Sequence, residues 1–192
     1  MISFFLSLDV SLFRLINQGT GESTFLDWFM LFMTNLKNFT YVLIILGIWI
    51  VGREGKAGVV FLVFLGITIA VTDQFSNQAL KWWFGRMRPC GALPGVHLLT
   101  DCNTSYSFPS AHAVNIFAGA FFLSQPFRRL TPLWYAIAAT VGYSRIYIGV
   151  HYPTDVIGGA GIGILLAWPL RVLKDRVVLQ LDWASRPGPL RR

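Results

Sequence analysis

The fold of this chain is decided by residues 58–72, which read GVVFLVFLGITIAVT. No charged residue interrupts this run, and a helix that includes it can continue through Asn77 and Lys81 to Trp83. A helix needs about 20 mainly apolar residues to cross the hydrocarbon core of a bilayer. The stretch therefore predicts a membrane-spanning helix.

The composition of the whole chain fits the same environment. Its 192 residues, enough for one domain, are 54% hydrophobic and 13% charged, with a mean hydropathy of +0.56. Soluble domains carry about 25% charged residues. The net charge of +7 is also found in nucleic-acid-binding proteins, but cytoplasmic loops of membrane proteins accumulate Lys and Arg as well. We therefore expect the lipid bilayer, and no nucleic acid, as the partner.

Further apolar runs complete the pattern. Four of them are Phe39–Val51, Ala111–Ser124, Thr131–Val150 and Val156–Leu173. The first two are short of about 20 residues, so their helices must tilt or recruit flanking residues. A sixth run, Phe25–Leu36, carries Asp27 and is ambiguous. We expect an all-α fold, a multi-pass transmembrane helical bundle with five or six spans.

Both ends of the chain differ from the bundle. Residues 1–24 form an interfacial region, in which Asp9 and Arg14 interrupt the apolar positions of an amphipathic helix, Ile2–Ile16. That helix is expected to lie in the membrane interface or to be a poor span. Residues 185–192 are rich in Pro, Gly and Arg and are expected to be disordered. Residues 1–192 are expected to form a single membrane-embedded domain.

The distribution of cations predicts an orientation. Ten of the sixteen Lys and Arg residues fall in loops on one face: Arg53, Lys56, Arg128, Arg129, Arg171, Lys174, Arg176, Arg186, Arg191 and Arg192. The opposite face holds Lys37, Lys81, Arg86, Arg88 and Arg145. Because positive loops stay in the cytoplasm, the second face is expected to be exoplasmic, in the periplasm or outside the cell.

Two cysteines lie in one loop of the exoplasmic face. Cys90 and Cys102 can form a disulfide in an oxidising compartment, or can remain two free thiols. We favour the disulfide.

The first polar motif is Lys81-x6-Arg88-Pro89. Seven residues are close to two helical turns, so Lys81 and Arg88 are expected to share a face. Pro89 disfavours helix at Arg88, which places Arg88 where the helix opens into the loop. A point charge beside a planar guanidinium is suited to gripping phosphate. Alternatively, the two are cations snorkelling at the membrane boundary.

The second motif is Pro109-Ser110-Ala111-His112. Ser110 opens an apolar helix and is predicted to cap it. Helix N-termini present free N–H groups and a positive dipole end to anions. His112, in the first turn, is then placed to protonate a leaving oxygen. The alternative is an ordinary cap followed by a buried histidine.

The third motif is Ser144-Arg145-x5-His151-x3-Asp155. Pro153 suits the first turn of the last helix, so His151 is expected at or just before its start and Asp155 in its first turn. Asp155 can accept the N–H of one imidazole nitrogen and leave the other free to attack. Arg145 adds a third cation. The alternative is a charged turn between two helices.

Together the three motifs resemble those of the type 2 phosphatidic acid phosphatase family of membrane lipid phosphatases, over roughly residues 81–155. The family signatures are Lys-x6-Arg-Pro, Pro-Ser-Gly-His and Ser-Arg-x5-His-x3-Asp. The first and third match fully. In the second, Ala111 replaces glycine, and because alanine is small we expect the geometry to be kept.

The resemblance implies an enzyme that uses a phosphohistidine and no metal or other cofactor. His151 would be the nucleophile, Asp155 would orient it, and His112 would protonate the leaving group. The phosphoryl oxygens would be held by Lys81, Arg88, Ser110, Ser144 and Arg145. The sequence agrees on the metal, because the motifs offer cations where a metal site would offer clustered carboxylates and thiolates.

Several functions fit these residues. A lipid phosphatase at the outer leaflet is the first, with undecaprenyl diphosphate as the leading substrate because the small size and short amphipathic N-terminal stretch resemble those of the small undecaprenyl-diphosphate phosphatases. Phosphatidylglycerol phosphate, phosphatidic acid and the lipid A 1-phosphate are alternatives. Phosphoryl transfer to a lipid acceptor would use the same residues. A non-catalytic anion transporter or scaffold is a further class, but a transporter places its polar site near the bilayer midplane.

Overall fold

The structure, a computed structural model, describes residues 2–185, and within that range it holds helices and turns but no strand. The all-α prediction is confirmed, and the expected tail lies outside the described residues except for Ser185. In chain order the elements are α1 (Ile2–Asn17), α2 (Thr24–Thr34), η1 (Leu36–Phe39), α3 (Thr40–Glu54), α4 (Lys56–Gln74), η2 (Phe75–Leu80), α5 (Lys81–Phe84), α6 (Pro89–Ala92), α7 (Ala111–Leu123), η3 (Arg128–Leu130), α8 (Thr131–Tyr147) and α9 (Pro153–Ser185).

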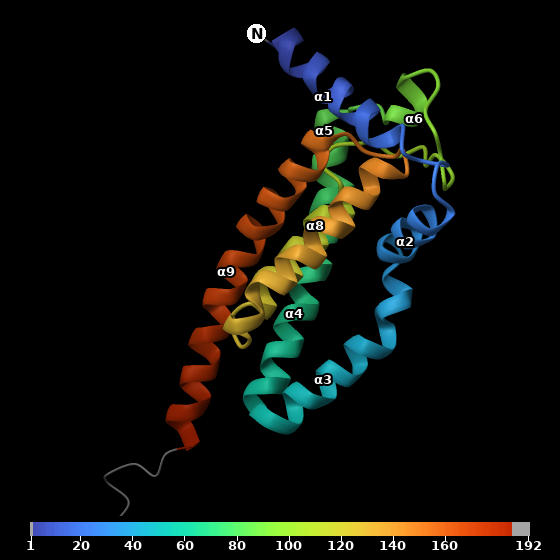
Figure 1. Ribbon diagram of the computed structural model, residues 1–192. Coiled ribbons are helices and arrows are strands. Elements are labelled where there is room, and N and C mark those ends of the chain that lie inside the picture. The colour runs from blue at the N-terminus through green and yellow to red at the C-terminus, as the bar shows by residue number, and fades with distance from the viewer. Residues whose placement is uncertain (1, 186–192) are drawn as a thin grey trace, which may run out of the picture.

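Helix α7 is the centre of the bundle and packs against α4, α8 and α9 (Figure 1). Its side chains Ala113, Val114 and Ala118 are fully buried. Two glycines of α9 allow the close approach of α7: a Cβ on Gly163 would lie 2.1 Å from the Val114 carbonyl oxygen, and one on Gly159 would lie 2.9 Å from that of Ser110. Small residues spaced in this way let helix backbones meet in membrane proteins.

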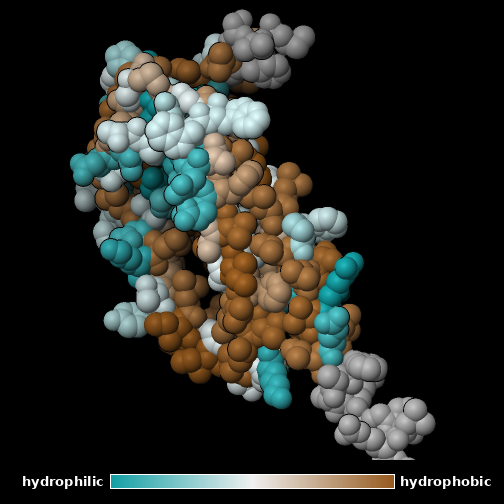
Figure 2. Space-filling model, turned by 180° about the vertical axis from the view of Figure 1, so that it is seen from behind, coloured by the Kyte–Doolittle hydropathy of each residue, from teal (hydrophilic) through white to brown (hydrophobic). Residues whose placement is uncertain are grey.

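The surface of the bundle is apolar over most of its length. Figure 2 shows a hydrophobic body with a large group of polar side chains towards one end and a smaller group at the other. On α3, Ile50 is the one buried side chain, whereas Tyr41, Ile45 and Ile48 are more than 60% exposed. An apolar face without protein partners is what a bilayer would cover.

Three helical segments of the described chain are long and apolar enough to cross a membrane: Leu36–Glu54, Lys56–Ala92 and Pro153–Leu181. Helices α2 and α7 are apolar but shorter. The chain is therefore a transmembrane helical bundle, and the count of five or six spans stays a prediction.

The basic loops and the polar motifs lie at opposite ends of the bundle. Arg53 and Lys56 flank the turn between α3 and α4, and η3 carries Arg128 and Arg129 between α7 and α8. At the other end, α5 ends, α7 begins, α8 ends and α9 begins (Figure 1). All three motifs therefore meet at the end away from these four cations.

Helix α1 lies across the motif end of the bundle (Figure 1). The predicted amphipathic helix is present: Asp9, Phe13 and Asn17 are buried on one face, while Leu12 and Leu15 are exposed. The Phe13 ring packs edge-on against that of Tyr152, with centroids 5.6 Å apart. Asn17 Nδ2 donates to the carbonyl oxygens of Tyr147 and His97, both at 2.8 Å. Helix α1 is thus tied to the start of α9 and the end of α8.

Candidate active site

A cavity of about 550 Å³ opens at the motif end of the bundle. Five of the predicted site residues line it: Lys81, Arg88, His112, Arg145 and His151. They come from five separate segments: α5, the α5–α6 loop, the first turn of α7, the last turn of α8 and the loop before α9. The fold therefore gathers three cations and two imidazoles around one space.

Lys81 reaches the cavity from a continuous helix, as predicted. Helix α4 passes through a π-helical turn, Phe75–Leu80, directly into α5. Such turns often mark functional sites. The helix ends at Gly85, which adopts the left-handed conformation with φ of 56°. Because Arg88 lies beyond this end in extended backbone, the expectation that Lys81 and Arg88 share a helix face is wrong.

Arg88 is held by oxygen acceptors and by one imidazole. Its Nε donates to the Ser105 carbonyl oxygen at 2.8 Å, and Nη2 donates to Ser105 Oγ at 2.9 Å. Nη1 donates to the Val150 carbonyl oxygen at 3.0 Å and lies 3.0 Å from His151 Nε2. A guanidinium can only donate, so Nε2 accepts and the ring proton belongs on Nδ1. That tautomer leaves a lone pair on the nitrogen that faces the cavity.

The other side of His151 faces Asp155. The distance from Nδ1 to Asp155 Oδ2 is 3.5 Å. Ser107 lies between them: its Oγ donates to Asp155 Oδ2 at 2.5 Å and is 3.4 Å from His151 Nδ1. The backbone N–H of Tyr152 donates to the same Oδ2 at 2.8 Å. Burial lowers the pKa of His151 to about 4, because removal from water disfavours the imidazolium, so the ring is neutral at pH 7.

Ser110 and His112 begin α7. Ser110 occupies the N-cap position, but its side chain makes no capping hydrogen bond, which corrects that part of the prediction. Its N–H instead donates to the Asp155 carbonyl oxygen at 3.1 Å and holds the residue against α9. The buried Oγ has no hydrogen-bond partner within residues 2–185. His112 follows in the first turn and lines the cavity, as predicted.

Arg145 and Ser144 take different positions although they are adjacent. Arg145 lines the cavity, and its Nη1 donates to Thr34 Oγ1 of α2 at 2.6 Å. Ser144 is fully buried, does not line the cavity, and donates to the Val141 carbonyl oxygen at 2.7 Å. A serine inside a helix readily bonds the carbonyl one turn back. The structure therefore does not bring Ser144 into the predicted phosphate cradle.

Comparison with known proteins identifies the family. The model of the PAP2 superfamily matches residues 57–178. The chain belongs to the PAP2 superfamily. It is 32% identical to the lipid A 4'-phosphatase of Bacteroides thetaiotaomicron, over 98% of this chain and 86% of that relative. It is 29% identical to the undecaprenyl-diphosphatase of Sulfolobus acidocaldarius, over 82% and 74%. The crystal structure of Aquifex aeolicus LpxE has a TM-score of 0.66 at 30% identity, over 85% of this chain and 94% of that one.

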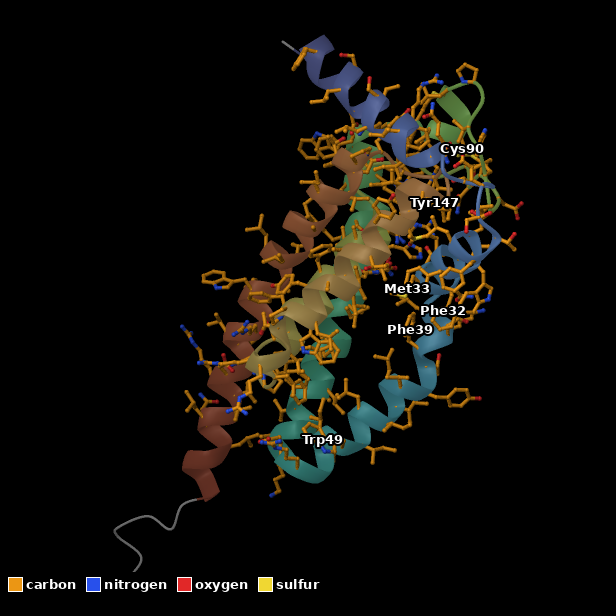
Figure 3. All side chains as sticks on the ribbon, viewed as in Figure 1. Phe32, Met33, Phe39, Trp49, Cys90 and Tyr147 are labelled. Atoms are coloured by element: carbon orange, nitrogen blue, oxygen red, sulfur yellow. A yellow bond between two sulfur atoms is a disulfide. The ribbon has the colours of Figure 1, made fainter. Side chains whose placement is uncertain are left out.

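The predicted disulfide of this PAP2 chain is present between Cys90 and Cys102, with Cα atoms 6.0 Å apart. Cys90 lies in α6 at the motif end of the bundle (Figure 3). The bridge closes the loop that continues into Ser105, the partner of Arg88. Within the described residues no group of three His, Cys, Asp or Glu side chains is arranged to hold a metal ion. Metal independence stays a prediction.

Sequence reasoning missed three groups around the PAP2 motifs. The first is Ser107, the residue between His151 and Asp155. The second is the membrane-side wall of the cavity, where Asp73 Oδ1 accepts from Asn77 and Asn115. The third is the pair of Arg86 and Asp9. A charged residue inside or beside an apolar run needs a partner within the protein. Asp73 and Asp9 are such residues, so a search for their partners could have found these two groups from the sequence.

Proposed function

We propose that this PAP2 protein is a membrane lipid phosphatase that forms a phosphohistidine on His151. One observation carries the proposal: His151 lines the cavity with an unprotonated Nε2 that accepts from Arg88, and Lys81 and Arg145 line the same space. A phosphate group that enters the cavity meets Lys81, Arg88 and Arg145. Such cations stabilise the charge that spreads over the phosphoryl oxygens in the transition state.

The reaction takes two steps. In the first, Arg88 Nη1 turns from His151 Nε2 to a phosphoryl oxygen, the Nε2 lone pair attacks phosphorus, a P–N bond forms, and the P–O bond to the lipid breaks. The imidazolium form of His112, which the negative charge of the bound phosphate favours, gives its proton to the departing oxygen, and the charge gained by His151 is balanced by Asp155 through Nδ1–H. In the second, His112 removes a proton from water, which attacks phosphorus and releases inorganic phosphate from His151. Ser110, like Ser144, is fully buried and does not line the cavity, so it has no phosphate contact in this scheme.

The cavity wall favours a lipid substrate. Leu36 of η1 lines the cavity together with the polar groups. Next to it, Phe32, Met33 and Phe39 form an apolar corner on α2 and η1, and the rings of Phe32 and Phe39 are 5.3 Å apart (Figure 3). From there the exposed apolar surface of α3 begins. A lipid can therefore place its phosphate in the cavity while its chains stay in the bilayer.

The separation of the cations supports one side of the membrane for the cavity. The loops with Arg53, Lys56, Arg128 and Arg129 lie at the end opposite the cavity. Because positive loops tend to face the cytoplasm, this separation supports our proposal that the cavity opens at the exoplasmic face of the inner, or cell, membrane. The disulfide between Cys90 and Cys102 fits an oxidising compartment. The substrate is then a lipid of the outer leaflet.

The first substrate to test is a phosphate ester of lipid A, because the lipid A 4'-phosphatase relative aligns with 98% of this chain. Undecaprenyl diphosphate, the leading substrate from sequence, is the second, on the likeness to an undecaprenyl-diphosphatase. Phosphatidylglycerol phosphate and phosphatidic acid complete the panel.

The test is phosphate release by the purified protein in detergent against this panel. We expect turnover of at least one lipid, none with His151→Ala, and an acid-labile phosphoenzyme when a labelled substrate is quenched in alkali. Transfer of the labelled phosphate to a lipid acceptor would indicate that the protein is a phosphotransferase and not a hydrolase. If the protein binds these lipids but hydrolyses none of them, the proposed phosphatase activity is refuted, and a scaffold or transporter is favoured.

A further inference from the structure

Arg86 lies two residues before Arg88 but serves a different space. It does not line the cavity. Its Nη1 donates to Asp155 Oδ1 at 2.7 Å and to Thr154 Oγ1 at 2.7 Å, and its Nη2 donates to Asp9 Oδ2 at 2.6 Å. The guanidinium carbon lies 3.9 Å from the centroid of the Tyr152 ring. Every one of these contacts is to the start of α9 or to α1.

Asp9 completes the arrangement from α1. Its side chain is 3% exposed. Oδ1 accepts the backbone N–H of Thr154 at 3.0 Å, and Oδ2 accepts the Thr154 hydroxyl at 2.6 Å as well as Arg86. A guanidinium can bridge two carboxylates because its donors are fixed in a plane. Asp9, Arg86 and Asp155 thus form a row of alternating charges.

This row fixes the carboxylate that faces His151. Arg86 occupies Asp155 Oδ1, while Ser107 and the Tyr152 N–H occupy Oδ2. With both oxygens engaged, the carboxylate cannot rotate, and Oδ2 stays directed to His151 Nδ1. Arg86 itself is held in place by Asp9, since the other end of its planar group has that partner. An orienting carboxylate works only while its own geometry is fixed.

We propose that Arg86 and Asp9 are positioning residues for the His151–Asp155 pair, and that α1 is therefore part of the catalytic machinery. Neither residue touches substrate. Arg86 acts on Asp155 directly, and Asp9 acts through Arg86 and through the first turn of α9. The inference rests on the proposed phosphohistidine chemistry, but it assigns function to a helix that lies outside all three motifs.

A merely structural clamp makes a different prediction from a positioning one. If the row only holds α1 to α9, its loss lowers stability and reduces the amount of active protein without changing its kinetics. If it positions Asp155, the folded protein turns over more slowly. Because Arg86 and Asp9 lie outside the cavity, substrate binding should be unchanged in either case.

The experiment compares purified Arg86→Gln and Asp9→Asn with the wild-type protein. The control is Arg14→Gln, which removes an exposed charge from α1, the helix that carries Asp9. We expect kcat of both variants to fall at least tenfold, with KM and the inhibition constant of inorganic phosphate within about threefold of wild type. Arg14→Gln should keep its kcat. The double variant should lose little more than Arg86→Gln alone, because residues that act as a unit are not additive.

The pH profile separates positioning from simple destabilisation. The charged and titratable groups that act on His151 include Arg88, Arg145, Asp155 and His112, and all four remain in both variants. Loss of the Arg86 cation should raise the pKa of His151 and move the acid limb of kcat/KM to higher pH. Loss of the Asp9 anion should not. Asp9→Glu should restore part of the turnover, since a carboxylate is again available to Arg86.

Three outcomes would overturn the inference. Folded Arg86→Gln with kcat within twofold of wild type is the first, and a raised KM with unchanged kcat is the second, because it would mean substrate contact. If Arg86→Gln does not fold, Arg86→Lys and Asp9→Glu are measured instead. The third outcome is then a wild-type kcat and a wild-type pH profile in both of these variants. An inactive wild-type protein would instead refute the proposed function, so the two failures are distinguishable.

Discussion

Ser107→Ala tests the hydrogen-bonded contact between His151 and Asp155, in which Ser107 takes part although it lies outside all three motifs. Ser107 is fully buried, its Oγ donates to Asp155 Oδ2 at 2.5 Å, and it lies 3.4 Å from His151 Nδ1. The substitution removes this hydroxyl and leaves the backbone in place. Asp155 keeps the Tyr152 N–H at 2.8 Å and Arg86 at 2.7 Å.

The expected magnitude follows from these contacts. A hydrogen bond to a charged group contributes about 1.5–3 kcal/mol. About 1.4 kcal/mol of transition-state stabilisation corresponds to tenfold in rate. Because two of the three donors to Asp155 remain, we expect the lower part of this range, a fall in kcat of about tenfold, with KM unchanged.

The assay is steady-state phosphate release from a lipid that wild type hydrolyses. Ser124→Ala is the matched control, because its hydroxyl bonds the Phe121 carbonyl oxygen at the other end of α7. A kcat of Ser107→Ala equal to that of the control would refute the reasoning, and so would a rise in KM alone, which would make Ser107 a substrate contact.

The remaining predictions concern the chemistry and the topology. His151→Ala and His112→Ala should each abolish turnover in protein that still folds and inserts, as judged by size-exclusion chromatography; near-wild-type phosphate release by either removes the mechanism. The neutral imidazole of His151 is the reactive form, and its pKa is lowered to about 4, so kcat/KM should fall on the acid side only near pH 4 rather than about 6.5. A fall in kcat/KM of wild type near pH 6.5 would contradict this. Activity should persist in EDTA and be inhibited by vanadate, whereas loss in EDTA that Mg²⁺ or Zn²⁺ restores refutes metal independence. After mild reduction, a membrane-impermeant thiol reagent should label Cys90 and Cys102 on intact cells, and labelling only after permeabilisation would put the cavity on the cytoplasmic side.

Local sequence was sufficient for the elements that obey local rules. The apolar run 58–72 is helical because no charged residue or proline interrupts it, and Pro153 begins the last helix where its missing N–H is harmless. The order of charges along the chain also predicted that the motifs meet at one end. The two helical features depend on residues within one or two turns of each other, and the third depends only on the order of the charges along the chain.

Features that depend on distant contacts could not be predicted in this way. Arg88 reaches the cavity from extended backbone because Gly85 ends the helix early, and its carbonyl partners come from the Ser105 and Val150 loops. Ser107 is an unremarkable serine in the sequence and is decisive only because α9 lies beside it. Asp9 is 77 residues from Arg86. Spacing rules contain no information about such pairs.

The two neighbouring arginines show how partners, and not residue type, decide the role of a cation. Arg86 lies between two carboxylates, so its charge is balanced within the protein and little remains to attract an anion. Among residues 2–185, Lys81, Arg88 and Arg145 form no ion pair with a carboxylate. Arg88 and Arg145 are held by carbonyl and hydroxyl oxygens, which orient a guanidinium without cancelling its charge. A cavity whose cations are oriented in this way keeps its positive potential for a phosphate, and the same chain uses a balanced cation where rigidity alone is needed.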